Sequence, residues 1–192
     1  NQALDRIYVS AGPSYEPMGK GADFSWESNA IAKALYAGGF RKGDIVIVTF
    51  AYHLSPAGLS FNDGVRTLGA AVIPAGVGNT DLQVQIMHDV GVTAFIGTPT
   101  FLMTLIKRAE EQGYNFRKDF TLKHAIFTAE PLPDSLRNVL EQDYRINTSQ
   151  IFAVGQISPF AYECSQKNGM HFEGNSIIEV VDPTTGNQLG PG

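Results

Sequence analysis

Several classes of protein are excluded by features that the sequence has in short supply. It contains one cysteine, Cys164, so no disulfide framework can form within it and a reducing, cytoplasmic compartment is expected. Apolar runs stay below the roughly 18 residues that a membrane-spanning helix needs, so no membrane partner is expected. Charged residues make up only 17% and the net charge is −5, without a basic block, which argues against nucleic acid as a partner.

Metal and dinucleotide signals are equally sparse. Cys164 and His171 supply only two of the four ligands of a structural zinc site, so we expect Cys164 to be a structural residue instead. No Gly-x-Gly-x-x-Gly lies between the first expected strand and helix, which leaves a dinucleotide-dependent oxidoreductase as a weak alternative.

The 192 residues, 43% of them hydrophobic, are enough for one sizeable core and show a regular alternation of elements. Short β-branched stretches predict buried strands at Asp44–Phe50, Ala70–Pro74, Thr93–Gly97, His124–Phe127 and Gln150–Ala153. Amphipathic spacing predicts helices at Glu27–Ala37, Ser55–Leu68, Thr80–Val90, Thr100–Gln112 and Pro133–Gln142, with Thr80 as the N-cap of the third. This alternation predicts an α/β fold, a doubly wound and mostly parallel sheet with flanking helices.

The sequence pattern changes after about residue 160. Ser176–Val181 has the composition of a strand, and an Asp-Pro-Thr-Thr-Gly turn follows it, as in a hairpin. We therefore expect residues 1–160 to form the α/β core of a large domain and residues 161–192 to begin a β subdomain. The turn-rich last residues predict that the segment belongs to a longer protein.

Ligands of doubly wound sheets bind beyond the carboxyl ends of the strands, which makes four segments candidates for a site. Tyr8–Pro17 is a small-residue turn that could cradle phosphate, although a surface loop is the more ordinary interpretation. Thr128–Pro133 and Phe152–Gln156 offer small residues beside a flat ring, or are simple strand ends. Phe50–Gly58 combines aromatic and small residues as an acyl pocket does, and its His53 is a candidate base, although a lone histidine is more often packed or capping.

The order and spacing of several segments are more specific than any one motif. These segments are Gly76-Val77-Gly78-Asn79-Thr80, Gly97-Thr98-Pro99-Thr100, Thr128-Ala129-Glu130-Pro131, Tyr162-Glu163-Cys164, Lys167-Asn168-Gly169-Met170-His171, Asp182-Pro183 and Gly190-Pro191-Gly192. As a set they resemble the phenylacetate–coenzyme A ligase-like branch of the adenylate-forming superfamily, from about Arg6 to Gly192. The resemblance implies an N-terminal adenylation domain whose small C-terminal domain lies beyond this segment.

Such enzymes activate a carboxylic acid with ATP and Mg²⁺ to an acyl-adenylate, then transfer the acyl group to coenzyme A. The implied partners are therefore a small carboxylic acid, ATP and coenzyme A, with a homodimer as an open option. The resemblance assigns ATP or AMP binding to Ser10, Gly12, Ser14, Ala129, Glu130, Pro131, Phe152, Ala153 and Gln156. It assigns the acyl pocket to Tyr52, His53, Pro56, Gly76 and Gly78, and it assigns no catalytic residue.

Two departures from the family pattern affect the triphosphate. The family's phosphate loop ends in Lys-Pro, whereas Glu16 stands at the lysine position, Tyr15 at a glycine position, and Pro13 removes one N–H donor. Replacing attraction by repulsion at ~4 Å changes the interaction energy by several kcal/mol before screening, with an effective dielectric near 20. At the position of the magnesium-ligating glutamate stands Gln156, which lacks the charge that magnesium prefers.

Three interpretations follow from these departures. The altered loop could still adenylate, with the metal held by ATP phosphates and a substitute acid such as Glu163. The domain could bind nucleotide or acyl ligand without turnover. It could also have kept the adenylation fold for assembly with a partner.

Overall fold

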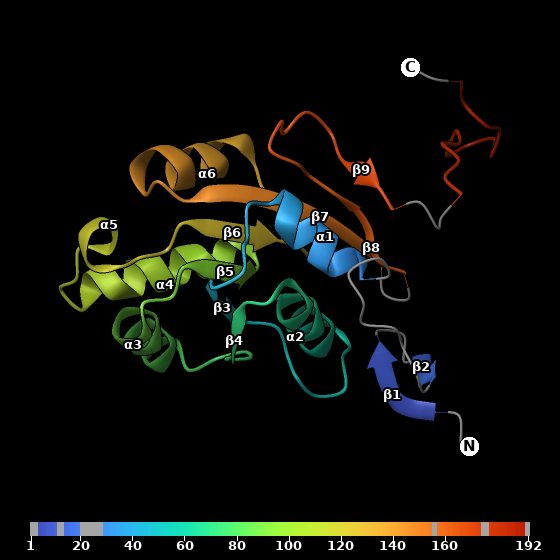
Figure 1. The fold of residues 1–192 in the computed structure, drawn as a ribbon. Helices are drawn as coiled ribbons and strands as arrows, with labels where there is room; N and C mark the ends of the chain where they lie inside the picture. Colours follow the sequence, from blue (N-terminus) through green and yellow to red (C-terminus); the bar gives the residue numbers. More distant parts are fainter. Residues whose placement is uncertain (1–3, 11–13, 20–28, 155–156, 174–176, 191–192) are drawn as a thin grey trace.

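The computed structural model describes residues 4–10, 14–19, 29–154, 157–173 and 177–190, and their main feature is a seven-stranded sheet (Figure 1). The strand order is β4-β3-β5-β6-β7-β8-β9. The first five in this order run parallel, and β8 and β9 extend the sheet antiparallel. The strands of the sheet are β3 (Ile45–Val48), β4 (Ala71–Pro74), β5 (Ala94–Gly97), β6 (His124–Phe127), β7 (Asn147–Val154), β8 (Ile157–Tyr162) and β9 (His171–Phe172).

A separate antiparallel hairpin precedes the sheet and consists of β1 (Leu4–Ser10) and β2 (Ser14–Gly19). The helices are α1 (Ala30–Ala37), α2 (Ala57–Leu68), α3 (Thr80–Val90), α4 (Pro99–Glu111), α5 (Phe116–Asp119) and α6 (Asp134–Asn138), which continues into the π-helical turn η1 (Val139–Asp143). The predicted α/β class and mostly parallel sheet are confirmed.

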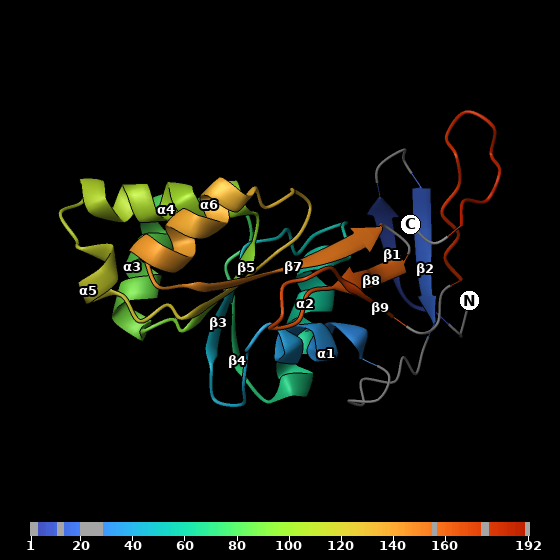
Figure 2. The same cartoon turned by 90° about the horizontal axis from the view of Figure 1, so that it is seen from above.

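Helices cover both faces of the sheet, and Figure 2 shows α4 and α6 on one side with α1 and α2 on the other. Because successive strand residues point to opposite faces, β3 feeds two separate cores. Ile47 packs with Met87 of α3 and Leu105 of α4. Val46 and Val48 pack in the other cluster, against α1 and α2.

Local chemistry sets the helix boundaries. Thr98 accepts a hydrogen bond from the Phe101 N–H at 3.3 Å, and Pro99 occupies the first turn of α4. Gly69 and Gly91 end α2 and α3 in the left-handed conformation, which glycine adopts without steric cost.

Three sequence predictions need correction. The N-cap of α3 is Asn79 rather than Thr80, because Asn79 adopts the left-handed conformation and the helix starts at Thr80. The expected helix 133–142 changes to π-type hydrogen bonding at Val139. The expected strand 176–181 is not a strand in its described part, where one bridge joins Val181 to Gln188 across a turn capped by Asp182.

The domain boundary expected near residue 160 lies within β8, which pairs with β7 in the main sheet. The β subdomain expected from residue 161 onward stays a prediction.

Successive strands are added first on one side of β3 and then on the other, which places a topological switch in the sheet. From β3 the chain passes through α2 to β4 on one side, then returns through α3 to β5 on the other side. The chain leaves β3 and β5 toward opposite faces of the sheet, and ligands of doubly wound sheets bind at such a switch, beyond the carboxyl ends of the strands. This edge contains the segments that the sequence singled out.

Close packing between β3 and β5 makes Gly97 a sensitive position. A Cβ at Gly97 would lie 2.2 Å from Thr49 Oγ1 and 2.6 Å from Phe95 Cζ. We predict that Gly97→Ala lowers the free energy of unfolding by about 2–3 kcal/mol through overpacking. Urea denaturation measures it, with Gly190→Ala as control, because nothing lies within 4 Å of a Cβ there. Equal stability of both variants would contradict the prediction.

Candidate functional site

The β1–β2 hairpin is held against the segment that follows β3. The Val9 N–H donates to the Leu54 carbonyl at 2.9 Å. Arg6 of β1 pairs with Asp63 of α2 at 3.3 Å. These contacts bring the end of the candidate phosphate loop beside the candidate acyl pocket, although the two are about 40 residues apart in sequence.

The hairpin closes with Ser10 opposite Ser14, so both predicted phosphate-loop serines flank its turn. Gly12, the third member of this set, lies outside the described residues. Glu16 of β2 pairs with Tyr8 of β1. Its Oε1 atom is buried and has no hydrogen-bond partner among the described residues. A buried carboxylate oxygen without a donor is costly, so this position calls for a cation or donor beside it.

The predicted adenine wall is a short strap after β6. Ala129 has a φ of +70°, an uncommon conformation for a residue with a Cβ. Glu130 accepts a hydrogen bond from Thr100 Oγ1 at 2.6 Å, which ties the strap to the start of α4. Pro131 is exposed, and the N–H of the next residue, Leu132, donates to Gln150 Oε1 at 2.9 Å.

The end of β7 presents an aromatic residue beyond this strap. Phe152 is 51% exposed although it lies in a strand, and Ala153 beside it is partly buried in the core. Gln156, predicted to complete this part of the site, lies outside the described residues. An exposed aromatic face next to a small residue is a surface on which a planar base can stack.

The predicted acyl-pocket residues come from two adjacent strand ends. Gly76 donates its N–H to the Val48 carbonyl at 3.1 Å, which joins the loop after β4 to the end of β3. Tyr52 and Pro56 are half-buried, whereas His53 is exposed. Burial raises the pKa of Tyr52 to about 12, with nearby Asp63 adding to the effect, and its Oη has no described partner. Tyr52 is therefore a neutral hydroxyl at physiological pH.

Sequence reasoning missed Gln83, which shapes the predicted acyl-pocket loop. Its side chain is 2% exposed and its Nε2 donates to the carbonyls of Gly76 at 3.0 Å and Gly78 at 2.7 Å. Both glycines have positive φ, at 68° and 80°. The signal that could have found it is a glutamine facing the core from an amphipathic helix, a position that normally holds an apolar residue.

Glu163 is not suited to the role of substitute magnesium ligand. The carboxylate accepts two hydrogen bonds from Arg137 Nη2 at 2.8 and 2.9 Å and two from Gln150 at 3.0 and 3.1 Å. The residue is 6% exposed. Both oxygens therefore accept from protein donors, and binding of a metal ion would have to displace them.

The described residues contain no group of three or more His, Cys, Asp or Glu side chains arranged to hold a metal ion. Cys164 is a half-buried free thiol, and the ring of His171 lies against Tyr162 with 6.0 Å between ring centroids. Within the described ranges, no helix has the length and apolarity required to cross a membrane.

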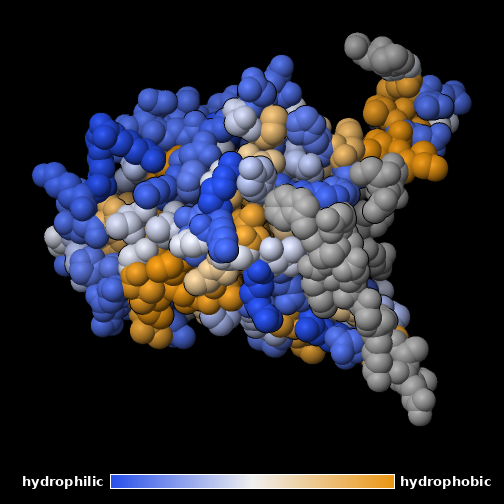
Figure 3. Space-filling model, viewed as in Figure 1, coloured by the Kyte–Doolittle hydropathy of each residue, from blue (hydrophilic) through white to orange (hydrophobic). Residues whose placement is uncertain are grey.

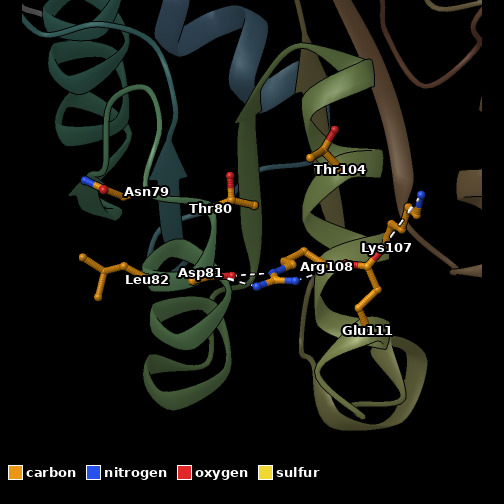
Figure 4. Close-up of a pocket in the computed structure, with 8 residues that line it drawn as sticks. All are labelled: Asn79, Thr80, Asp81, Leu82, Thr104, Lys107, Arg108 and Glu111. Atoms are coloured by element: carbon orange, nitrogen blue, oxygen red, sulfur yellow. Dashed lines mark hydrogen bonds and ion pairs between the residues drawn. The ribbon is translucent and has the colours of Figure 1, made fainter.

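A cavity of about 660 Å³ lies between the first turn of α3 and α4, and Asn79, which follows Gly78 in the chain, is among the residues that line it (Figure 4). Asp81 and Arg108 face each other across it, and hydrogen bonding to Arg108 lowers the pKa of Asp81. α3 also carries exposed Leu82, and Figure 3 shows apolar surface in the region of α3 and α4. Arg108 pairs with Asp81 and with Glu111 across this surface, and the residues that line the cavity include none of the predicted site residues.

Relatives in sequence match nearly the whole chain. It is 34% identical to the phenylacetate–coenzyme A ligase of Pseudomonas putida over 194 residues, covering 97% of this chain and 44% of that enzyme. It is 27% identical to the phenylacetate–coenzyme A ligase of Thermus thermophilus over 198 residues, covering 100% of this chain and 44% of that enzyme. The chain is a homologue of the phenylacetate–coenzyme A ligases. It spans less than half the length of these ligases, and no family model matches it.

Solved structures agree with the ligase homologues. A 2-hydroxyisobutyryl-CoA ligase in complex with 2-HIB-AMP and CoA in the thioesterification state superposes with a TM-score of 0.85 at 26% identity, over 98% of this chain and 42% of that one. A luciferase-like enzyme from Zophobas morio superposes with a TM-score of 0.66 at 12% identity, over 99% of this chain and 46% of that one. The second likeness shows the fold alone. The chain therefore has the fold of the adenylate-forming enzymes.

Gln83 offers a test of the loop that it holds. We predict that Gln83→Leu lowers the free energy of unfolding by about 2 kcal/mol, because two loop carbonyls lose their donor. Differential scanning calorimetry or urea denaturation measures this change. Gln85→Leu is the matched control, because Gln85 lies on the same helix with its side chain exposed. A variant Gln83→Leu as stable as the control would show that the loop keeps its shape without the amide.

Proposed function

We propose that the full-length protein activates a small aryl or acyl carboxylic acid with ATP to an acyl-adenylate and passes the acyl group to coenzyme A. The observation that carries the proposal is the match of almost the whole chain to somewhat less than half the length of enzymes named as coenzyme A ligases. The arrangement of loops at the carboxyl edge supports it.

In this proposal the nucleotide base lies between the strap and the end of β7. Ala129, Glu130 and Pro131 form the wall at the edge of the base, and Phe152 stacks on its face beside Ala153. The exposed ring of Phe152 and the strained φ of Ala129 support these roles. Gln156 completes this set by resemblance.

The carboxylic acid occupies the space next to the ends of β3 and β4. Tyr52, His53 and Pro56 line it from one side, and Gly76 and Gly78 from the other. Glycines there leave the backbone accessible, so an acyl or aryl group can approach it closely. The neutral hydroxyl of Tyr52, whose Oη has no described protein partner, is available to a substrate oxygen.

The part of the site expected to bind the phosphates has the fewest suitable donors and positive charges. Ser10, Gly12 and Ser14 would supply donors from the hairpin turn. Attack of the carboxylate on the α-phosphorus of ATP breaks the α–β phosphoanhydride bond and releases pyrophosphate, and this step needs such donors around the developing charge. Glu16 opposes this charge at short range. When bound, Mg²⁺ supplies charge neutralisation to the polyphosphate. The described residues offer no ligand set that fits it, so no step is assigned to the metal.

A second candidate function is a binding or assembly domain without turnover, favoured by Glu16 and Gln156 at the family's lysine and glutamate positions. Such a domain would bind a carboxylic acid or an adenylate but would not release pyrophosphate. Tight binding of ATP with magnesium counts against a pure assembly role.

The single free cysteine is consistent with a cytoplasmic location, which we include in the proposal.

The activity test uses the full-length protein. We predict acid-dependent exchange of labelled pyrophosphate into ATP in the presence of Mg²⁺, for at least one member of a panel of aryl and short acyl acids. Exchange without acid, measured in parallel, is the control for background hydrolysis. No exchange with any acid would reject the enzyme and favour the second candidate.

The altered charges give a sharper prediction. Glu16→Lys combined with Gln156→Glu should tighten ATP–Mg²⁺ binding by about 1–2 kcal/mol, because it restores charge-assisted contacts around the polyphosphate. Isothermal titration calorimetry measures the affinity. Glu179→Lys with Gln188→Glu is the matched control, since it makes the same charge changes at exposed positions near the end of the chain. Equal affinities for both double variants would place the polyphosphate elsewhere.

A further inference from the structure

We propose that Arg137, Glu163 and Gln150 form a relay that positions the strap Ala129–Leu132 and thereby sets the preference of the site for its purine base. The relay consists of side chains from α6, from the end of β8 and from β7. The relay itself stands on hydrogen bonds within the chain, and only its effect on base preference rests on the proposed function.

The relay is continuous from α6 to the strap backbone. Arg137 Nη2 lies 2.8 and 2.9 Å from the two oxygens of Glu163. Glu163 Oε1 accepts from Gln150 Nε2 at 3.1 Å, and its Oε2 accepts from the Gln150 backbone N–H at 3.0 Å. Gln150 Oε1 then accepts from the Leu132 N–H at 2.9 Å. Every step joins residues from different elements, so the strap is fixed to the sheet and not only to its own neighbours.

The two hydrogen-bond partners of the Gln150 side chain determine which way its amide points. Its NH₂ group faces a carboxylate, which can only accept, and its oxygen faces the Leu132 N–H, which can only donate. A flipped amide would lose both hydrogen bonds. The carboxylate of Glu163 thus acts on the strap through Gln150, which makes Glu163 a positioning residue and not a metal ligand.

Burial makes the relay rigid. The side chain of Arg137 is 13% exposed and that of Glu163 is 8% exposed. A buried ion pair gains little net stability over apolar packing, because desolvation of both charges offsets their attraction. Arg137 is held in addition by the Thr148 carbonyl and hydroxyl at 3.4 and 3.3 Å. An arrangement this specific, with little stability to gain, is consistent with a role in fixing geometry.

The strap needs such a fixed point. Ala129 has a positive φ, and conformations of this kind persist only where the surroundings determine them. The two ends of the strap are tied by Glu130 to Thr100 and by Leu132 to Gln150. Loss of the hydrogen bond between Leu132 and Gln150 would let the strap move, and in the proposed site the strap lies along the edge of the base. Polar discrimination between adenine and guanine depends on donors and acceptors along that edge, so a displaced wall lowers the preference.

The test uses the full-length protein and three variants. Gln150→Leu removes both hydrogen bonds of the amide at similar volume. Gln150→Glu keeps an acceptor for Leu132 but repels Glu163. Gln150→Glu with Glu163→Gln exchanges the amide and the carboxylate, so the two side chains can again bond at unchanged net charge. Gln142→Leu and Gln142→Glu are exposed controls for the same chemical changes.

Two readouts separate the relay from general stability. The first is hydrogen exchange of the Leu132 amide, which needs no nucleotide. The second is the ratio of ATP to GTP affinity by calorimetry. We expect Gln150→Leu to raise the exchange rate about tenfold and to lower the ATP preference about fivefold, as loss of one part-buried hydrogen bond predicts. We expect the double variant Gln150→Glu with Glu163→Gln to recover part of the slow exchange at Leu132 and part of the ATP preference. Gln150→Glu alone should recover neither the slow exchange nor the preference.

Each outcome has a distinct meaning. Unchanged exchange at Leu132 in Gln150→Leu overturns the relay, even if the enzyme is active. Faster exchange together with an unchanged ATP-to-GTP ratio overturns the effect on base preference and leaves a purely structural relay. A wild-type protein that binds neither nucleotide overturns the proposed function and the base preference with it, while the exchange rate still decides whether the relay holds the strap.

Discussion

Burial of the parallel strands on both faces is the constraint from which the rest of the structure follows. Ile47 faces one core and Val46 and Val48 face the other, so no middle position of β3 is free for a polar role. Side chains that could bind a ligand are therefore confined to the ends of the strands, where the chain emerges from between the two cores. Gly97 shows how tight this arrangement is, because Thr49 and Phe95 already fill the space that a Cβ would need.

Confinement to the strand ends makes the loop shapes decisive. Two of these loops are held by side-chain amides: the buried Gln83 binds the carbonyls after β4, and the half-buried Gln150 binds the strap after β6. Neither amide belongs to the residues proposed to touch a ligand. Each instead satisfies backbone groups that would otherwise be unpaired at the edge of the core, and so determines where the neighbouring small residues lie.

The fold could be predicted from the sequence because its signals are local. Strands such as Thr93–Gly97 are short apolar runs between glycines, and Gly69 and Gly91 mark helix ends by their own conformation. The role of Glu163 could not be predicted in this way. Its partners, Arg137 and Gln150, are 26 and 13 residues distant, and only the folded sheet brings them together. A carboxylate near a suspected metal site and a carboxylate in a buried ion pair look the same in sequence.

Two sets of residues bear on which function the domain performs: the altered residues expected near the phosphates, and the residues that shape the strap. The altered features, Glu16 and Gln156, are single side chains whose replacement leaves a fold intact. Two structural features carry a cost: Ala129 at positive φ and the largely buried Arg137–Glu163 pair each require support from several elements. A domain used only for assembly has no need of a strained strap at its carboxyl edge. This geometry therefore supports the proposal that the strap meets a ligand, even with the altered charges at Glu16 and Gln156.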